Sequence, residues 1–151
     1  MTVFLVMCDI DYDPENIDPY KSIELGSFDY LNCYFTTISN ILENKKWGSR
    51  FPILMESFES KTGIDPESAE ELIGELAEIS DELKNYTSAD IVCNGLELED
   101  SEWMMDAPFD TSSENLYDYF QTAEETNLTK TLYEYASEAF DENMCLLYIF
   151  Q

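Results

Sequence analysis

Histidine is absent from the 151 residues of this protein, and its absence excludes several kinds of chemistry at once. Ser-His-Asp and Cys-His catalysis need an imidazole as general base, and imidazole is also the commonest metal ligand. Carboxylate catalysis of the glycosidase kind needs only two acids. However, a chain with 33 acidic residues brings some pair close together by chance, so such a pair is not informative. The sequence therefore predicts no catalytic residue, no metal site and no cofactor.

Basic residues are scarce, because 7 Lys and Arg stand against 33 Asp and Glu and give a formal net charge of −26. A phosphate backbone is bound by lysine and arginine with release of counterions, so this chain would repel nucleic acid. An anionic membrane surface is excluded as a ligand for the same reason.

Cysteine occurs at four scattered positions, Cys8, Cys33, Cys93 and Cys145, without a CxxC pair or a metal-type spacing. We interpret the four as buried thiols in a reducing cytosol. The N-terminal segment has no basic region and Asp9 interrupts its apolar run, so it resembles neither a signal peptide nor a membrane anchor. A cytoplasmic location is the resulting expectation.

Hydrophobic residues are plentiful, at 44% of the chain, and 14% of the residues are aromatic. Disordered acidic tails lack such a supply of core-forming side chains. At this length a fold buries roughly 68–70% of the surface that its unfolded chain exposes. We therefore expect one compact domain over residues 1–151.

Two apolar runs of strand length lie near the ends of the chain, at 3–10 and 145–150, and we expect them to pair as buried strands. A further short strand is predicted at 89–93. Helical spacing predicts helices at 28–44, 52–58, 66–86 and 128–142, and a short one through 116–120 opened by a capping box at 111–114. Ser27 is predicted to cap the first of these helices, and Asp65, followed by Pro66, the third. The fold class is therefore α+β, with four or so helices packed on a small sheet formed by the N- and C-terminal strands.

The segment from Asp9 to Pro19 is predicted to be an acidic loop, because Pro14 and Pro19 exclude a regular helix or a central strand. Its aspartates at 9, 11, 13 and 18 resemble the alternating oxygen ligands of a calcium loop. Pro14 occupies the sixth position, where such a loop needs glycine, and Tyr20 occupies the twelfth, where it needs glutamate. We therefore interpret the segment as a loop without a metal.

Negative charge is concentrated in the second part of the chain. Residues 1–61 contain 10 acidic and 5 basic residues, a net −5, whereas residues 62–151 contain 23 and 2, a net −21. Seven acids are predicted to form a ridge on the helix at 66–86, opposite its apolar stripe: Glu67, Glu70, Glu71, Glu75, Glu78, Asp81 and Glu82. Two interpretations stay open, a solvated surface or an attraction for a basic partner, and the second makes Glu67, Glu70, Glu71, Glu78 and Asp81 secondary partner-binding candidates.

One of the two tryptophans lies in an acidic loop, next to Met104 and Met105. An aromatic ring and two adaptable thioethers surrounded by acids are typical of a binding hot spot with a charged rim. The predicted partner-binding residues are Glu97, Glu99, Asp100, Glu102, Trp103, Asp106 and Asp110. The alternative is a loop that packs Trp103 into the core.

The string Trp47-Gly48-Ser49-Arg50-Phe51-Pro52 contains the other tryptophan and the one arginine of the chain. A functional interpretation makes Arg50 an anchor for a partner. The favoured interpretation is a structural turn, in which Arg50 pairs with a neighbouring carboxylate and its aromatic flanks lie in the core.

This string, with the runs at 26–28, 35–38, 42–44 and 54–55, resembles the immunity-protein family numbered seventy among bacterial polymorphic-toxin systems. Asn115-Leu116, Tyr119-Phe120, Thr122 and the helix containing Leu132 are similar to its C-terminal half, so the resemblance covers about residues 26–142. It implies a small cytosolic protein that is encoded with a secreted toxin, binds the toxin domain and catalyses nothing. Segments 9–20 and 94–110 depart from the family pattern, and partner specificity is expected to diverge there.

The leading hypothesis is an immunity protein that occludes a basic, nuclease-like toxin domain, steered by charge and held by Trp103. The alternative is an acidic nucleic-acid mimic that inhibits a restriction or defence enzyme. A carboxylate enzyme is the weakest interpretation, because it requires a deep cleft with two carboxylates of raised pKa. The identity of the toxin, the stoichiometry and the oligomeric state do not follow from the sequence.

Overall fold

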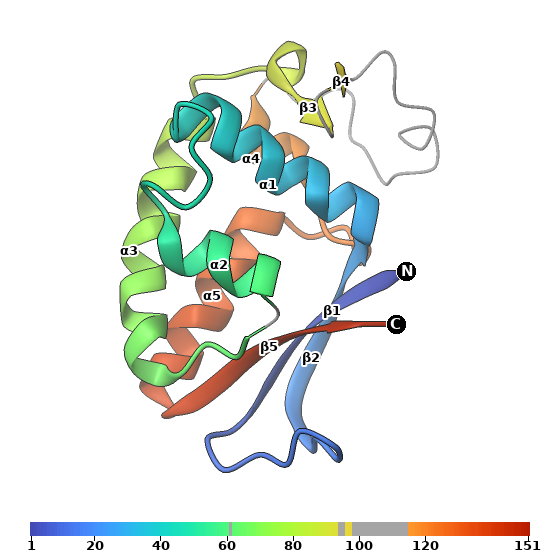
Figure 1. Ribbon diagram of the computed structural model, residues 1–151, viewed down its shortest axis with the longest axis vertical. Coiled ribbons are helices and arrows are strands. Elements are labelled where there is room, and N and C mark those ends of the chain that lie inside the picture. The colour runs from blue at the N-terminus through green and yellow to red at the C-terminus, as the bar shows by residue number, and fades with distance from the viewer. Residues whose placement is uncertain (61, 94–95, 98–114) are drawn as a thin grey trace.

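Three antiparallel strands form the main sheet of a computed structural model that describes residues 1–60, 62–93, 96–97 and 115–151 (Figure 1). The strands are β1 (Thr2–Asp9), β2 (Pro19–Ser27) and β5 (Met144–Phe150), in the order β2-β1-β5. The central strand β1 pairs with β5 from Val3, opposite Phe150, to Asp9, opposite Met144. The expected pairing of the N- and C-terminal strands is therefore confirmed.

Five helices lie on one face of this sheet (Figure 1), in the part of the chain that the structure describes. They are α1 (Phe28–Leu42), α2 (Pro52–Ser60), α3 (Pro66–Leu83), α4 (Leu116–Tyr119) and α5 (Leu128–Asp141). A 3-10 turn (Ser88–Asp90) leads to a hairpin of β3 (Val92–Cys93) and β4 (Leu96–Glu97). The α+β class is confirmed. Within the described ranges, none of the helices combines the length and apolarity that crossing a lipid bilayer requires.

Two helix caps predicted from the sequence are confirmed. At the start of α1, Ser27 Oγ accepts a hydrogen bond from the backbone N–H of Tyr30 at 3.1 Å. At the start of α3, Asp65 Oδ1 accepts one from the N–H of Ser68 at 2.7 Å, and Pro66 occupies the first helical position. Each cap satisfies a donor for which the first turn of a helix has no acceptor.

The short helix α4 is capped by Asn115, whose Oδ1 accepts a hydrogen bond from the N–H of Asp118 at 3.0 Å. The predicted capping box at 111–114 lies outside the described residues, and the cap observed is one residue beyond it. Asparagine is as effective an N-cap as serine, so this residue by itself gives the helix its start.

Strand β2 has no counterpart among the elements predicted from the sequence. It begins at Pro19, the residue with which the predicted acidic loop ends. Because β2 is an edge strand, proline is tolerated at its first position. Register shifts opposite Val3/Phe4 and Met7/Cys8 also disturb the alternation of polar and apolar residues by which a strand is recognised.

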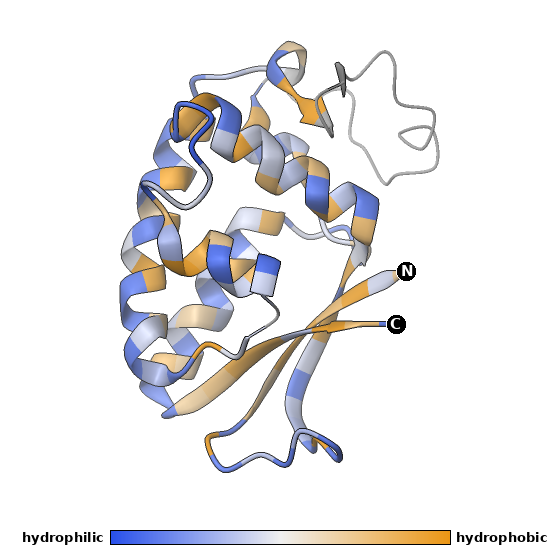
Figure 2. Ribbon diagram, in the orientation of Figure 1, coloured by the Kyte–Doolittle hydropathy of each residue, from blue (hydrophilic) through white to orange (hydrophobic). Residues whose placement is uncertain are grey.

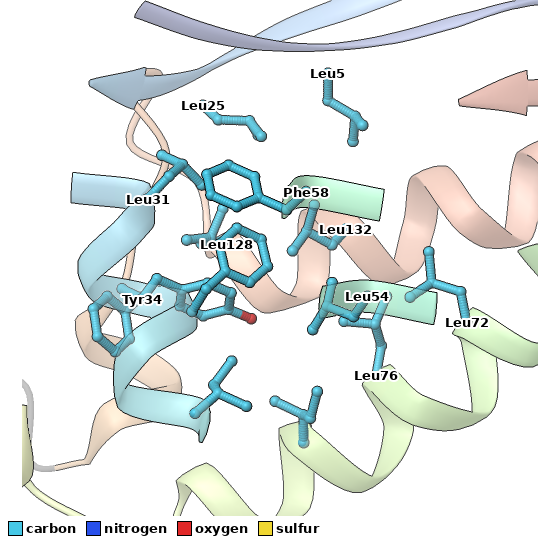
Figure 3. Close-up of a cluster of buried hydrophobic side chains, with 14 of the residues drawn as sticks. Leu5, Leu25, Leu31, Tyr34, Leu54, Phe58, Leu72, Leu76, Leu128 and Leu132 are labelled. Atoms are coloured by element: carbon cyan, nitrogen blue, oxygen red, sulfur yellow. The ribbon is translucent and has the colours of Figure 1, made fainter. Parts of the chain in front are cut away.

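The core lies between the sheet and the helices. Figure 2 shows hydrophobic residues along β1 and β5, and Figure 3 shows Leu5 of β1 facing leucines of the helices. Tyr34 is fully buried in this core, and its hydroxyl oxygen lies 2.8 Å from the hydroxyl oxygen of Thr129. The hydroxyl of Tyr34 therefore has a hydrogen-bond partner although it is buried. Each fully buried large apolar side chain contributes about 1.5–3 kcal/mol. This packing fixes the spacing of α1, α2 and α3, the helices that surround the turn at residues 47–52.

The cysteines match the expectation of buried thiols only in part. Cys8 and Cys145 are buried free thiols that lie opposite each other on β1 and β5. Burial raises the pKa of Cys8 to about 11. Cys33 is also buried, but its sulfur belongs to a disulfide, so the expectation of a free thiol is wrong there. The side chain of Cys93 lies outside the described part of the chain.

Candidate functional site

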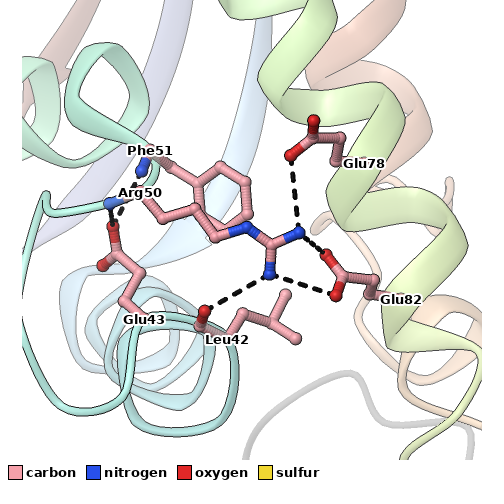
Figure 4. A network of polar contacts seen from close by, with 6 residues as sticks. All are labelled: Leu42, Glu43, Arg50, Phe51, Glu78 and Glu82. Atoms are coloured by element: carbon pink, nitrogen blue, oxygen red, sulfur yellow. Dashed lines mark hydrogen bonds and ion pairs between the residues drawn. The ribbon is translucent and has the colours of Figure 1, made fainter.

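One carboxylate, that of Glu43, holds together the turn at residues 47–52 (Figure 4). Glu43 is 3% exposed, and its two oxygens accept hydrogen bonds from the backbone N–H groups of Gly48 at 3.1 Å, Arg50 at 3.1 Å and Phe51 at 2.9 Å. Leaving one buried donor unpaired costs about 1–3 kcal/mol. Gly48 has a φ of 75°, a conformation that favours glycine. Glu43 was not among the predicted residues. The signal for it is an acid at the end of a helix shortly before a glycine-containing turn.

The guanidinium of Arg50 lies beside two glutamates of α3 (Figure 4). Its Nη1 donates to Glu82 Oε1 at 3.0 Å, its Nη2 pairs with Glu82 Oε2, and Nη2 lies 3.5 Å from Glu78 Oε2. The hydrogen bond to Glu82 is the main cause that raises the pKa of Arg50 above its ordinary value. Because the Arg50 side chain is 39% exposed, solvent screens these pairs, and we assign them about 1 kcal/mol. Arg50 is engaged within its own chain.

The carboxylate of Glu75 holds the start of α2. Its oxygens accept hydrogen bonds from the backbone N–H of Ile53 at 3.1 Å and of Leu54 at 3.0 Å, two donors of the first helical turn. Glu75 is half-buried, and burial raises its pKa above the ordinary value although both hydrogen bonds act in the opposite direction. The prediction that Glu75 and Glu82 belong to an outward ridge is therefore wrong, because both contact the chain around the turn.

The two aromatic flanks of Arg50 have different environments. Phe51 is fully buried, whereas Trp47 is 36% exposed. Trp47 lines a hollow of about 370 Å³, together with Met1, Phe28, Asn32, Phe58 and Glu59. The expectation that both flanks lie in the core is thus wrong for Trp47.

The outer side of α3 carries the five acids predicted as secondary partner-binding residues, and all five are exposed: Glu67, Glu70, Glu71, Glu78 and Asp81. Glu78 is engaged with Arg50. For the other four, no lysine or arginine nitrogen of the described residues lies within 4.0 Å of a carboxylate oxygen. We call these four residues the α3 ridge.

A groove of about 400 Å³ lies beside the ridge, and we call it the tyrosine groove. It is lined by Ala77, Ser80 and Asp81 of α3, by Tyr117 of α4, and by Lys130, Tyr133 and Glu134 of α5. The two tyrosines were not predicted, because α3 and α5 meet only through the tertiary packing and no local pattern connects them.

The predicted primary contact is at residues 97–110. Of its residues, Glu97 lies in β4 and its side chain is not described. Glu99, Asp100, Glu102, Trp103, Asp106 and Asp110 lie outside the described residues, so this assignment stays a prediction.

The acidic loop after β1 uses part of its carboxylates in local turns. Asp9 Oδ1 accepts a hydrogen bond from the N–H of Asp11 at 3.4 Å, and Asp13 Oδ1 accepts one from the N–H of Glu15 at 3.0 Å. Throughout the described ranges, no group of three or more acidic, cysteine or histidine residues is placed to hold a metal ion.

Several tyrosines have a raised pKa because they are buried, and their hydroxyls belong to the core. This holds for Tyr30, Tyr34 and Tyr148. The hydroxyl of Tyr30 accepts a hydrogen bond from the backbone N–H of Gln121 at 2.8 Å, which ties α1 to the segment after α4. The role of these groups is therefore structural.

A family model described as Immunity protein 70 matches residues 5–147. No curated protein and no solved structure matches the chain. The matched range contains the turn at 47–52, the α3 ridge and the tyrosine groove, and it also includes the segments 9–20 and 94–110.

Proposed function

The chain belongs to the immunity protein 70 family, and we propose that it neutralises a basic, nuclease-like toxin domain by occluding the active site of that domain. The family supports an immunity role, a cognate toxin as partner and a non-enzymatic mode of action. The basic character of the toxin, its nuclease-like activity and the occlusion are the parts that we infer from this chain.

The α3 ridge is the observation that carries the proposal. Its carboxylates are exposed and lack cationic partners in the described part of the chain, while Glu75 and Glu82 of the same helix are used within the fold. A nuclease binds a phosphate backbone with lysine and arginine, so unpaired carboxylates complement such a cleft. The total charge of −26 favours the same kind of partner.

Charge and apolar contact have separate tasks in this mechanism. At physiological ionic strength the Debye length is about 8 Å, so the ridge attracts the partner during the last approach and raises the association rate. Slow dissociation needs a desolvated anchor, for which Trp103 within residues 97–110 is the candidate from the sequence.

The first experiment is co-purification of the tagged protein with the toxin domain encoded beside its gene, followed by a growth-rescue assay. We expect a complex and rescue from toxicity. Absence of binding to this toxin domain would overturn the proposal. Inhibition of restriction or defence nucleases, without toxin binding, would support the nucleic-acid mimic instead.

The second experiment tests whether the ridge steers association. The variant Glu70→Lys/Glu71→Lys/Asp81→Lys is compared with Glu56→Lys/Glu59→Lys/Glu125→Lys, which reverses three exposed acids elsewhere and changes the net charge equally. We expect the ridge variant to associate at least about tenfold more slowly at low salt, with the difference shrinking at high salt. Equal slowing of both variants would show that only the net charge acts and would refute the role of the ridge.

A further inference from the structure

The tyrosine groove exists because α3 presents small side chains where it meets α5. Ala77 and Ser80 are three residues apart and so lie on the same side of α3. They leave space beside Tyr117 and Tyr133 that larger side chains would fill. Tyr133 is 37% exposed, so part of its ring is accessible from solvent.

The lining of this groove combines aromatic rings with carboxylates, which is the chemistry that binds organic cations. Asp81 and Glu134 supply the carboxylates, and Tyr117 and Tyr133 supply the rings. Lysines of the chain already use both kinds of group. Lys84 Nζ lies 5.1 Å from the centroid of the Tyr117 ring, and Lys130 Nζ lies 3.8 Å from Glu134 Oε1.

Two groups remain available for a cation from outside. Asp81 has no cationic partner among the described residues, and it belongs to both the groove and the α3 ridge. The exposed part of the Tyr133 ring lines the same groove. A guanidinium can stack on an aromatic ring while it donates two hydrogen bonds to a carboxylate, which an ammonium group cannot do.

We propose that the tyrosine groove receives an arginine side chain of the toxin domain, with its guanidinium stacked on Tyr133 and hydrogen-bonded to Asp81. This inference rests on the proposed function and names the side chain that the acidic surface recognises. The toxin cation approaches along the ridge and enters the groove at Asp81.

A second copy of this chain does not fit the groove. The chain has one arginine, Arg50, and its guanidinium is engaged with Glu78 and Glu82. A two-fold contact would also bring each α3 ridge against surface of the same negative sign. A basic protein that is not this chain is the occupant that matches the charge.

The test uses matched tyrosine variants and the toxin domain encoded beside the gene, with affinity measured by titration calorimetry. We expect Tyr133→Ala to weaken binding by about 30-fold or more, as truncation of a hot-spot residue does. Tyr133→Phe keeps the ring and is expected to stay within about threefold of the wild type. Tyr20→Ala, at an exposed tyrosine of β2, is the control and is expected to bind like the wild type.

Two further variants separate recognition from a merely structural role of Tyr133. Asp81→Asn removes the charge of an exposed residue and is expected to weaken binding about tenfold. Lys130→Ala removes a cation from the lining and is expected to tighten binding about two- to threefold, because that lysine opposes an incoming guanidinium. If Tyr133 only stabilised the fold and did not contact the toxin, Lys130→Ala would not tighten binding.

The outcomes distinguish this inference from the proposed function. If the wild type fails to bind the toxin domain, both are overturned. If the wild type binds but Tyr133→Ala and Asp81→Asn bind equally well, the groove is refuted and the immunity role stands. If only Tyr20→Ala weakened binding of the toxin domain, the toxin would contact the sheet and not the tyrosine groove, and the inference would again be refuted. If Tyr133→Ala fails to fold, Asp81→Asn and Lys130→Ala decide the question.

Discussion

The carboxylates around the turn at 47–52 and those of the α3 ridge are chemically alike, yet their environments are opposite. Glu43, Glu75 and Glu82 accept hydrogen bonds from backbone N–H groups or from Arg50. The ridge residues Glu67, Glu70, Glu71 and Asp81 are exposed and have no cationic partner among the described residues. In a chain with 33 acids, the function of a carboxylate therefore follows from what it contacts and not from its charge.

The first set is used within the fold, and the second is the set that we propose for contact with the toxin. Glu75 and Glu71 illustrate the difference, since they are one helical turn apart on α3 while one is half-buried against α2 and the other exposed. Substitutions in the two sets are expected to affect different measurements, either the free energy of unfolding or the rate of toxin binding.

The largest effect on the free energy of unfolding is expected when Glu43 is substituted. Glu43→Ala leaves three backbone donors of the turn without their acceptor, and we expect the free energy of unfolding to fall by about 3 kcal/mol or more. Urea denaturation measures this loss, with the exposed Glu71→Ala as control. A loss below about 1 kcal/mol would contradict the role of Glu43 in holding the turn.

Glu75 is expected to have a smaller, pH-dependent effect. Glu75→Ala removes the acceptor for two donors at the start of α2 and should lower the free energy of unfolding by about 1–2 kcal/mol. Burial raises the folded-state pKa above the ordinary value of 4.5, so the folded state favours the protonated carboxyl. The wild type therefore loses stability from this group as the pH rises from the ordinary value through the raised one.

Glu75→Gln tests this sign, because its amide does not titrate. Its stability relative to the wild type should improve between pH 4 and pH 7 in urea denaturation. A change in the opposite direction would mean that the hydrogen bonds from Ile53 and Leu54 outweigh burial.

The ion pairs of Arg50 are expected to contribute less to the free energy of unfolding than the hydrogen bonds of Glu43 and Glu75. Arg50→Ala should lower the free energy of unfolding by about 1 kcal/mol, because these pairs are partly exposed. Thermal unfolding at low and at 1 M salt should show the loss decreasing with salt. Lys130→Ala, which breaks a helical pair with Glu134, is the comparison and should cost about 0.3 kcal/mol.

The smallest effect on stability is expected on the ridge. Glu70→Ala, Glu71→Ala and Asp81→Ala should each change the free energy of unfolding by less than about 0.5 kcal/mol, since all three residues are exposed and none forms an ion pair with a described residue. Together they should slow toxin association at low salt. A large loss of stability in these ridge variants would contradict the distinction between acids that stabilise the fold and acids that do not.

Much of the fold could be predicted from local patterns. The strands at both ends, the helices α1, α2, α3 and α5, and the caps at Ser27 and Asp65 all depend on residues a few positions apart. Strand β2 was missed because an edge strand with register shifts and a proline start lacks a regular alternation. The exposure of the ridge acids followed from the helical period alone.

The candidate site could be predicted only in part. The sequence placed Arg50 in a turn and favoured a neighbouring carboxylate as its partner, but Glu82 lies 32 positions away, and Glu75 lies 22 positions from Ile53. The tyrosine groove depends on α3, α4 and α5 meeting, and no spacing within one helix shows that Ala77 and Tyr133 share a cavity.

The sequence by itself determined the acidic charge of the chain, the α+β class and the family-like turn, because charge, periodicity and caps are properties of neighbouring residues. Only the tertiary structure decided which carboxylates accept hydrogen bonds within the fold and which stay exposed without a cationic partner among the described residues. That division depends on hydrogen-bond donors brought close by packing, and donors such as the N–H groups of Ile53 and Leu54 reach Glu75 only once α2 and α3 are in contact.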